Sequence, residues 1–179
     1  MDIKKTANSF ANFTIKRIAE IFGLTVFCAG ALLLLALITY SPEDPNFIFP
    51  ENTKIDNILG FQGSFVSDVF FQSIGLVSYF FSFTLIITGI NIIRSKEFFL
   101  IIENIFFAII YSLLGTLFFA HFYSEAFTLY INGNGGFIGA YLNQSFLNSI
   151  ILINEVIFYY LLIILNIFLF LISINFHPI

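Results

Sequence analysis

The chain has 179 residues, of which 59% are hydrophobic and only 10% are charged. A soluble domain usually carries about 25% charged residues, so this composition excludes an ordinary water-soluble protein and indicates a membrane protein. The net charge is −4 with seven Lys and Arg residues in all, which argues against a nucleic-acid-binding surface, because such a surface requires clustered basic residues.

Residues 1–20 form a basic lead to the first hydrophobic run, which covers residues 21–40. A helix needs about 20 apolar residues to cross a hydrocarbon core of about 30 Å, and this run has that length. A cleaved signal peptide would have a shorter run of about 7–15 residues followed by small residues at a cleavage site, so we predict an uncleaved anchor. Phe10, Phe13 and Ile18 lie among the basic residues, which indicates an interfacial helix leading into the anchor.

Three further hydrophobic runs cover residues 69–93, 98–119 and 150–174. Within hydrocarbon a helix satisfies all of its backbone hydrogen bonds internally, so we assign every run as a helix. The sequence therefore predicts an all-α integral membrane protein with four transmembrane helices over residues 21–174. Residues 175–179 are expected to begin a cytoplasmic linker.

The basic residues predict the orientation of these helices, because Lys and Arg accumulate on the cytoplasmic side. One group precedes the first helix, and another lies in the tight turn between the second and third helices. The chain crosses the membrane twice between the two groups, so both lie on the same side. Only Lys54 lies opposite. We therefore expect both termini in the cytoplasm and the loops 41–68 and 120–149 outside. The basic residues that set this orientation are Lys4, Lys5, Lys16, Arg17, Arg94 and Lys96.

The two outer loops contain signals for turns and a short helix. Pro42, Pro45 and Pro50 favour turns and extended backbone in the first loop. The second loop carries the turn-forming sequence Asn-Gly-Asn-Gly-Gly at 132–136. After it, apolar residues recur every four positions, which predicts a short amphipathic helix in the membrane interface. These residues are Ile138, Leu142 and Phe146.

Small residues predict which helices pack closely, because helices in lipid associate where their backbones can approach. The first three predicted helices each carry such residues on one face, whereas the fourth has no Gly, Ala or Ser between residues 150 and 172. We therefore expect the first three helices to pack tightly and the fourth to be peripheral or to contact another subunit. The small residues are Gly23, Gly30, Gly75, Ser78, Ser82, Gly89, Ala108, Ser112 and Gly115.

Polar residues inside the apolar runs are the candidate functional groups. Glu155 and Asn166 share one stripe of the fourth helix with Tyr159 and Leu162, and we expect this stripe to face protein, because a carboxylate facing lipid is costly. Glu155 is either a proton or cation site or a carboxyl group near the interface.

Two other acids lie near helix ends. Glu103 lies near the inner end of the third helix, where Arg94 or Lys96 could pair with it. Asp68 lies at the outer start of the second helix, a position that favours an acid.

No residue set points to catalysis, a cofactor or a metal. His121 and His177 fall on opposite sides of the membrane in this topology, so they cannot share a metal. Cys28 is interpreted as a packing residue. In the Gly-rich stretch 133–139, Ile138 stands where a dinucleotide-binding motif requires its third Gly, and no Gly-Lys-Ser/Thr of a P-loop is present.

The end of the first hydrophobic run resembles a known family. Residues 39–46 read Thr-Tyr-Ser-Pro-Glu-Asp-Pro-Asn, which resembles the Thr-Tyr-Ser-Pro-x-Asp-Pro-Ser element after the first transmembrane helix of FtsK/SpoIIIE-type DNA translocases, with Asn46 in place of Ser. Further matches follow in the family's order, although Ser67 replaces an Ala and Ile74 a Phe. The matching residues are Thr39, Tyr40, Ser41, Pro42, Asp44, Pro45, Gly60, Asp68, Gly75, Tyr79, Gly135, Gly136 and Gly139.

This resemblance covers about residues 21–174 and implies an N-terminal four-helix membrane module. In that family the module anchors the protein at the division septum of the inner membrane, oligomerises and contacts other division proteins. A linker, a P-loop ATPase motor and a DNA-reading domain follow it in the family. None of these three has a counterpart here, so the resemblance implies either a truncated translocase or a stand-alone anchor, without an enzymatic site and without direct nucleic-acid binding.

An alternative remains open from the residues alone. In this alternative, the chain is a small subunit of a transporter or respiratory complex, and Glu155 or Glu103 lies in an ion path. Substitution of Glu155 by Gln would abolish ion movement in that case, and it would leave an anchoring role largely intact.

Overall fold

The computed structural model describes residues 3–45, 54–124 and 132–176, with side chains from Asn8 onward. Asn46, Pro50 and His177 lie outside the described residues. Within the described ranges the chain is helical and contains no strand. The elements are α1 (Ile3–Ile38), α2 (Gly60–Ile74), the 3-10 helix η1 (Gly75–Val77), α3 (Ser78–Ser95), α4 (Leu100–Phe122), α5 (Gly136–Asn143), α6 (Phe146–Ile151) and α7 (Glu155–Ser173).

Four helical stretches are long and apolar enough to cross a membrane: Asn8–Ile38, Gly60–Ser95, Leu100–Phe122 and Glu155–Ser173. The predicted fold class, an all-α protein with four membrane-spanning helices, is therefore confirmed. Where one short amphipathic helix was predicted in the second loop, the described residues form two, α5 and α6. Ser145 separates them, because its hydroxyl accepts a hydrogen bond from the Leu147 N–H at 3.2 Å and so caps α6.

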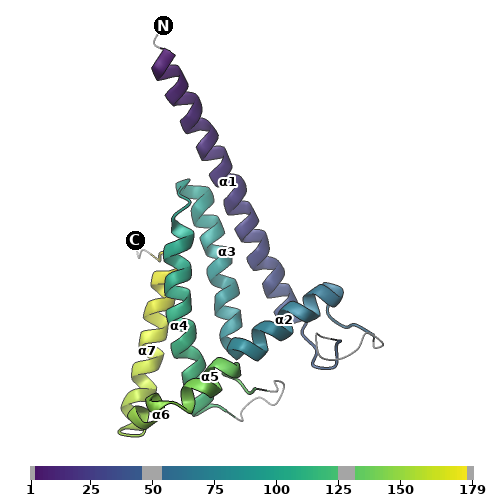
Figure 1. Cartoon of the computed structure of the whole chain (residues 1–179), viewed down its shortest axis with the longest axis vertical. Helices are drawn as coiled ribbons and strands as arrows, with labels where there is room; N and C mark the ends of the chain where they lie inside the picture. Colours follow the sequence, from purple (N-terminus) through teal and green to yellow (C-terminus); the bar gives the residue numbers. More distant parts are fainter. Residues whose placement is uncertain (1–2, 46–53, 125–131, 177–179) are drawn as a thin grey trace.

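The long helices form a row in which α1 packs on α3, α3 on α4, and α4 on α7 (Figure 1). The start of α1 and the end of α7 lie at one set of ends of the long helices, which we call the terminal side. The helices α2, α5 and α6 lie at the opposite ends of the long helices, which we call the loop side (Figure 1). The helices α1 and α7 are thus the two edges of the row.

The first helix starts earlier than the sequence predicted. Instead of an interfacial lead and a helix from residue 21, α1 is one continuous helix of 36 residues, about 54 Å long. No Gly or Pro occurs between residues 3 and 22, so nothing in the backbone interrupts it. This length exceeds a hydrocarbon core of about 30 Å, and the first part of α1 extends beyond the other helices (Figure 1).

The second predicted helix, residues 69–93, also begins earlier and is bent. Helix α2 starts at Gly60, and Gly75 ends it with φ +59°, a value incompatible with a straight α-helix. The buried face of α2 includes Gly63, Ser64 and Ser67. Hydropathy does not detect such a face, because its residues are small and polar rather than apolar.

The fourth predicted helix, residues 150–174, begins later. Helix α7 starts at Glu155, because the Asn154 side chain caps it by accepting from the Ile157 N–H at 3.1 Å. Residues 150 and 151 belong to α6 instead. Glu155, which a helix beginning at residue 150 would place more than a turn from its outer end, therefore lies in the first turn of α7.

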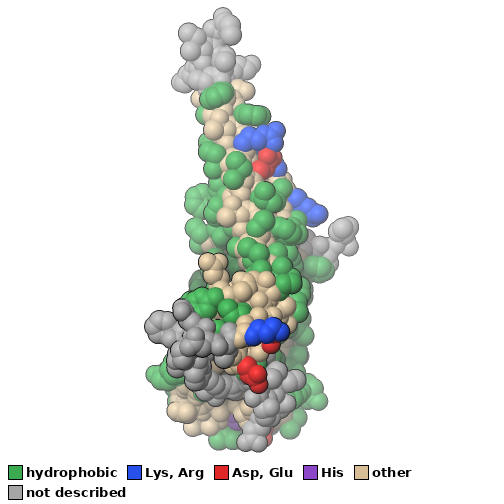
Figure 2. Space-filling model, turned by 90° about the vertical axis from the view of Figure 1, so that its right-hand side faces the viewer, with side chains coloured by type: hydrophobic (Ala, Val, Ile, Leu, Met, Phe, Trp, Pro, Cys, Tyr) green, Lys and Arg blue, Asp and Glu red, His purple; other side chains and the backbone are tan. Residues whose placement is uncertain are grey.

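Buried apolar residues form small clusters along the row, around Phe71, Tyr111 and Leu162. Large apolar side chains also cover the outside. Figure 2, which shows the face on the α1 side, has hydrophobic side chains over the long middle part with charged groups above and below. An apolar belt between charged ends is the surface expected of a protein in a bilayer.

Candidate functional site

Three glycines bring α1 and α3 into close contact. A β-carbon on Gly30 would lie 2.7 Å from the Ile86 nitrogen, and one on Gly89 would lie 2.5 Å from the Phe27 nitrogen. A β-carbon on Gly23 would lie 2.9 Å from the Gly89 oxygen. These backbones pack so tightly that no side chain fits between them, which is how helices associate in lipid.

Other small residues lie in α3 and α4. Ser78 and Ser82 are buried, and their hydroxyls donate to the carbonyl oxygens of Gly75 and Tyr79 at 2.6 and 2.7 Å. Each hydroxyl is thereby satisfied within its own segment, which lets it sit in an apolar contact. In α4 the stripe of Ala108, Ser112 and Gly115 is buried.

A group of charges joins α1 to the turn before α4 on the terminal side. The Glu20 carboxylate lies 2.6 Å from the Lys96 nitrogen and 2.6 Å from the Arg17 guanidinium. Lys96 thus pairs with Glu20 and not with Glu103, the partner considered from the sequence. Lys96 also adopts φ +63° at the end of α3 and donates to the Ile93 carbonyl oxygen.

The first family motif closes the loop-side end of α1. The Asp44 carboxylate accepts hydrogen bonds from the backbone N–H groups of Asp56 and Asn57 at 2.8 and 2.9 Å. The Asn57 amide in turn donates to the carbonyl oxygens of Ala36 and Thr39 at 2.9 and 3.2 Å. Asp44 therefore positions a side chain that satisfies one carbonyl in the last turn of α1, which has no partner within the helix, and one carbonyl just after that helix.

The remaining residues of this motif shape the turn. The Ser41 carbonyl accepts from the Asp44 N–H at 3.2 Å, and Pro42 lies exposed in that turn. The Pro45 carbonyl accepts from the buried Ser64 hydroxyl at 3.0 Å, which attaches the loop to α2. Gly60 has φ +65° at the first position of α2.

Aromatic residues connect α1, α2 and α3 beneath this cap. The Tyr40 hydroxyl donates to Asp68 at 3.2 Å, and the Tyr79 hydroxyl donates to the Leu37 carbonyl at 3.3 Å. The Phe71 ring packs against both tyrosine rings. Asp68 lies inside α2 rather than at a helix N-terminus, because α2 begins eight residues earlier, at Gly60.

The motif glycines of the second loop meet the bend at Gly75. The Leu76 N–H donates to the Asn134 carbonyl at 2.9 Å. A β-carbon on Gly75 would lie 1.9 Å from that same oxygen, and one on Gly136 would lie 2.6 Å from the Ser73 oxygen. On the other side, β-carbons on Gly135 and Gly139 would each lie 2.4 Å from the Thr116 oxygen. The glycines therefore let this loop lie directly on the backbones of α2 and α4.

Polar residues between the long helices form bonds that link them. The Thr84 hydroxyl lies 2.9 Å from the Tyr111 hydroxyl and 3.2 Å from the Ser173 hydroxyl, which connects α3, α4 and α7. The Asn104 amide donates to the Thr88 hydroxyl at 2.8 Å. The small-residue pattern does not single out these residues. The signal that would find them is a polar residue inside an apolar run, which in lipid bonds to a neighbouring helix.

The two acidic candidates lie far apart. Glu103 is exposed in the first turn of α4 on the terminal side, and Glu155 is exposed in the first turn of α7 on the loop side. The first turn of a helix favours an acid, which accounts for both positions. The expected stripe on α7 faces protein only from Tyr159 onward, where the Tyr159 ring packs against Phe118.

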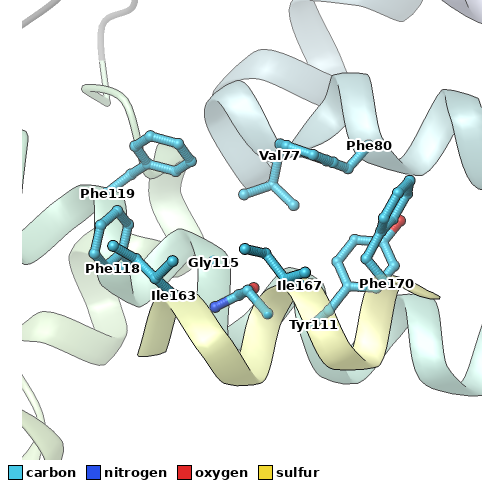
Figure 3. Close-up of a pocket in the computed structure, with 10 residues that line it drawn as sticks. Val77, Phe80, Tyr111, Gly115, Phe118, Phe119, Ile163, Ile167 and Phe170 are labelled. Carbon is cyan, nitrogen blue, oxygen red and sulfur yellow. The ribbon is translucent and has the colours of Figure 1, made fainter. Parts of the chain in front are cut away.

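Asn166 lies beside a hollow between α3 and α7 whose floor is α4 (Figure 3). The Asn166 amide donates to the Leu162 carbonyl at 2.8 Å. The hollow has a volume of about 180 Å³ and an almost wholly apolar lining. We call it the α3–α7 hollow; its other lining residues are Val77, Phe80, Tyr111, Gly115, Phe118, Phe119, Ile163, Ile167 and Phe170.

The described histidine and cysteine have ordinary surroundings. His121 Nδ1 lies 3.0 Å from the Asn143 side-chain oxygen, and Cys28 is exposed on α1. Among the described residues, no three His, Cys, Asp or Glu side chains come together as a metal site.

The family model for the 4TM region of the DNA translocase FtsK/SpoIIIE matches residues 15–177. The chain belongs to this family. The resemblance seen in the Thr-Tyr-Ser-Pro motif is thereby confirmed. The matched residues include the Asp44 turn at the end of α1, the contact of the second-loop glycines with Gly75, and residues of all four long helices.

Two DNA translocases named FtsK show similarity along part of their length. The protein of Rhizobium meliloti (strain 1021) is 31% identical over 78 residues, which are 44% of this chain and 9% of that protein. The protein of Caulobacter vibrioides is 35% identical over 79 residues, 44% of this chain and 10% of that protein. The matches thus span about a tenth of the relatives' length. No solved structure matches the chain.

The FtsK/SpoIIIE 4TM region is the membrane part of the translocase, and four apolar helices agree with this. The chain is a multi-pass protein of the bacterial inner membrane. No catalytic domain is indicated within the matched residues.

Proposed function

We propose that this chain tethers a DNA-translocating motor to the inner membrane at the division septum, that it self-associates there, and that it contacts other division proteins. The observation that carries the proposal is the family match over residues 15–177. The chemistry of the described polar residues supports it. Asp44, Asn57, Tyr79 and Thr84 bond to neighbouring helices and loops, so their role is to hold the module together.

We further propose that the terminal side faces the cytoplasm. Four of the basic side chains that the structure describes, Lys16, Arg17, Arg94 and Lys96, lie on this side, and Lys54 lies on the loop side. Basic residues near membrane helices favour the cytoplasmic side. A motor that follows the C-terminal end would then be held where the chromosome is.

A localisation experiment tests the tethering role. The chain is fused after Ile179 to a fluorescent protein and expressed in a dividing bacterium that encodes a translocase of this family. We expect membrane fluorescence concentrated at the septum. A matched control carries the same fusion on an unrelated four-helix membrane protein and should label the whole envelope. Uniform envelope fluorescence from this chain would contradict septal tethering while leaving membrane insertion intact.

A further inference from the structure

A hollow lined by aromatic rings and one carboxylate lies at the loop-side end of α7. Its volume is about 260 Å³. Glu155 and Tyr159 are one helical turn apart, so they share a face of α7, and Phe122 at the end of α4 lies on the other side. We call this space the Glu155 hollow; its lining residues are Phe122, Glu155, Val156, Tyr159 and Tyr160.

The rings around the Glu155 hollow hold one another in place. The Tyr159 ring stands nearly perpendicular to the Phe122 ring, at a centroid distance of 5.2 Å, and to the Tyr160 ring, at 5.3 Å. Edge-to-face packing of this kind is favourable for aromatic rings. The Tyr159 hydroxyl also lies 2.7 Å from the Tyr123 hydroxyl, which ties α7 to the end of α4. The hollow is therefore formed before any ligand enters it.

The Glu155 carboxylate has no Lys or Arg partner among the described side chains. Lys54 is the basic residue of the loop side, and it pairs with Asp56 at 3.6 Å in the loop after α1. That loop and the start of α7 lie at opposite edges of the row (Figure 1). The other six Lys and Arg residues of the sequence lie in α1 or at the end of α3. The negative charge of Glu155 is thus left for a cation from outside the chain.

A carboxylate beside aromatic rings is suited to an organic ammonium ion. Aromatic faces attract a cation within about 6 Å, and aromatic cages recognise ammonium ligands in this way. The carboxylate adds charge-assisted hydrogen bonds, which a primary ammonium can donate and a quaternary ammonium cannot. A helix start favours an acid and a membrane interface favours tyrosine, but neither preference requires them to line one hollow. The combination therefore fits a primary ammonium group.

The depth of the Glu155 hollow indicates a lipid headgroup as the source of that ammonium. Helix α7 has 19 residues and is about 28 Å long, close to a hydrocarbon core of about 30 Å. Its first residue, Glu155, thus lies at the level where hydrocarbon meets headgroups. Leu152, Ile153 and Val156 beside it are 56%, 79% and 68% exposed. A charge surrounded by exposed apolar side chains suits a molecule that has both a charged head and acyl chains.

We propose that the Glu155 hollow binds a phospholipid whose headgroup ends in a primary ammonium group. The ammonium donates to the Glu155 carboxylate and lies against the rings of Tyr159 and Tyr160. The acyl chains follow the exposed side of α7, which is an edge of the row. This site depends neither on tethering nor on self-association, and it exists whichever way the chain is oriented, so it goes beyond the proposed function.

Native mass spectrometry of the full-length chain in detergent measures the binding of individual lipids. The probes are phosphatidylethanolamine and phosphatidylcholine with identical acyl chains, which present a primary and a quaternary ammonium group. Both lipids have the same net charge, so the basic side chains on the terminal side do not distinguish them. We expect phosphatidylethanolamine to bind up to about fivefold more tightly, the range of an exposed ion pair.

Two matched variants assign this preference to the Glu155 hollow. Glu155→Gln keeps the size of the side chain and removes its charge, so the two lipids should then bind equally. Glu103→Gln removes an acid that is likewise exposed in the first turn of its helix, but on the terminal side, and should retain the full preference. A preference that survives Glu155→Gln would overturn the proposal. Equal binding of both lipids by the unaltered chain would also overturn it and would leave a basic side chain of another protein as the occupant.

The aromatic part of the site has its own readout. Tyr160 is 61% exposed, so its ring can be removed without opening the core. Tyr160→Leu should weaken the binding of both lipids about two- to fivefold, the effect of an exposed cation–π contact, whereas Tyr160→Phe keeps the ring and should bind like the unaltered chain. Unchanged binding by Tyr160→Leu would overturn the role of the ring. If the unaltered chain shows no lipid preference while its fluorescent fusion stays septal, the lipid site is wrong and the tethering role stands.

Discussion

Gly75 is the residue on which the loop-side geometry depends most. Its φ of +59° and ψ of −140° are readily adopted only by glycine, and a β-carbon would collide with the Asn134 carbonyl oxygen at 1.9 Å. We expect Gly75→Ala to displace the loop that carries Asn134 and to lower the free energy of unfolding in detergent by more than about 2 kcal/mol. Denaturant titration followed by circular dichroism measures this loss.

Gly60 supplies the control for that experiment. It has a similar φ of +65°, but a β-carbon there would meet no atom within 4 Å. Gly60→Ala should therefore cost only the left-handed backbone strain of about 1–2 kcal/mol. Equal losses from the two substitutions would show that the contact with Asn134 contributes nothing.

Asp44 is the second residue with a prediction of its own. Its buried carboxylate accepts two backbone hydrogen bonds at 2.8 and 2.9 Å, so Asp44→Ala leaves two N–H groups without a partner. We expect a loss of about 1–3 kcal/mol in the free energy of unfolding. The neighbouring Glu43 is exposed, and Glu43→Ala should change stability by less than about 0.5 kcal/mol. A neutral Asp44→Ala would contradict the capping role assigned to this carboxylate.

At the scale of elements, the contact of α1 with α3 depends on backbone approach. Gly30→Val would place side-chain atoms against the Ile86 nitrogen, which lies 2.7 Å from the β-carbon position. The helices must then separate, at a cost of about 1–3 kcal/mol. Ala29→Val adds the same kind of side chain on the exposed side of α1 and should be nearly neutral. Detergent-micelle unfolding compares the pair, and a neutral Gly30→Val would show that this contact does not hold α1 in place.

Hydropathy predicts where a helix begins and ends only if the helix ends where its apolar run ends. It locates α4 within a few residues, because both ends of that run are marked by polar residues. It misses the first half of α2, whose buried face is Gly63, Ser64 and Ser67, and it misplaces the start of α7, which the Asn154 cap determines. Boundaries made by a cap or a φ above zero are local hydrogen-bond chemistry, which an average of hydrophobicity does not contain.

The candidate site shows a similar division. The motif residues near Thr39 can be found from their order in the sequence, since most lie within one continuous stretch. The contact of Gly75 with Asn134 and the bond of Thr84 to Ser173 join residues 59 and 89 positions apart. A single sequence, taken without an alignment, holds no signal that pairs such distant positions. Each residue alone could contact many partners, and nothing in its own neighbourhood along the chain selects one of them.

At the scale of the whole molecule, the terminal side and the loop side must face opposite sides of the membrane, and an experiment can assign each of them. Labelling with a membrane-impermeant maleimide answers it in a Cys28→Ser background, which removes the native thiol. Ser9 is exposed on the terminal side and Glu43 is exposed on the loop side, so each accepts a single reporter cysteine without disturbing packing.

We expect Glu43→Cys to be labelled in intact spheroplasts and Ser9→Cys only after the membrane is permeabilised. The reason is the uneven distribution of charge: positive side chains near the ends of membrane helices are retained in the cytoplasm, and the described Lys and Arg residues are concentrated on the terminal side. Labelling of Ser9→Cys alone in intact spheroplasts would invert the orientation. It would also place the C-terminal end outside, where a motor attached to it could not reach the chromosome, so the same result would refute the tethering role together with the topology.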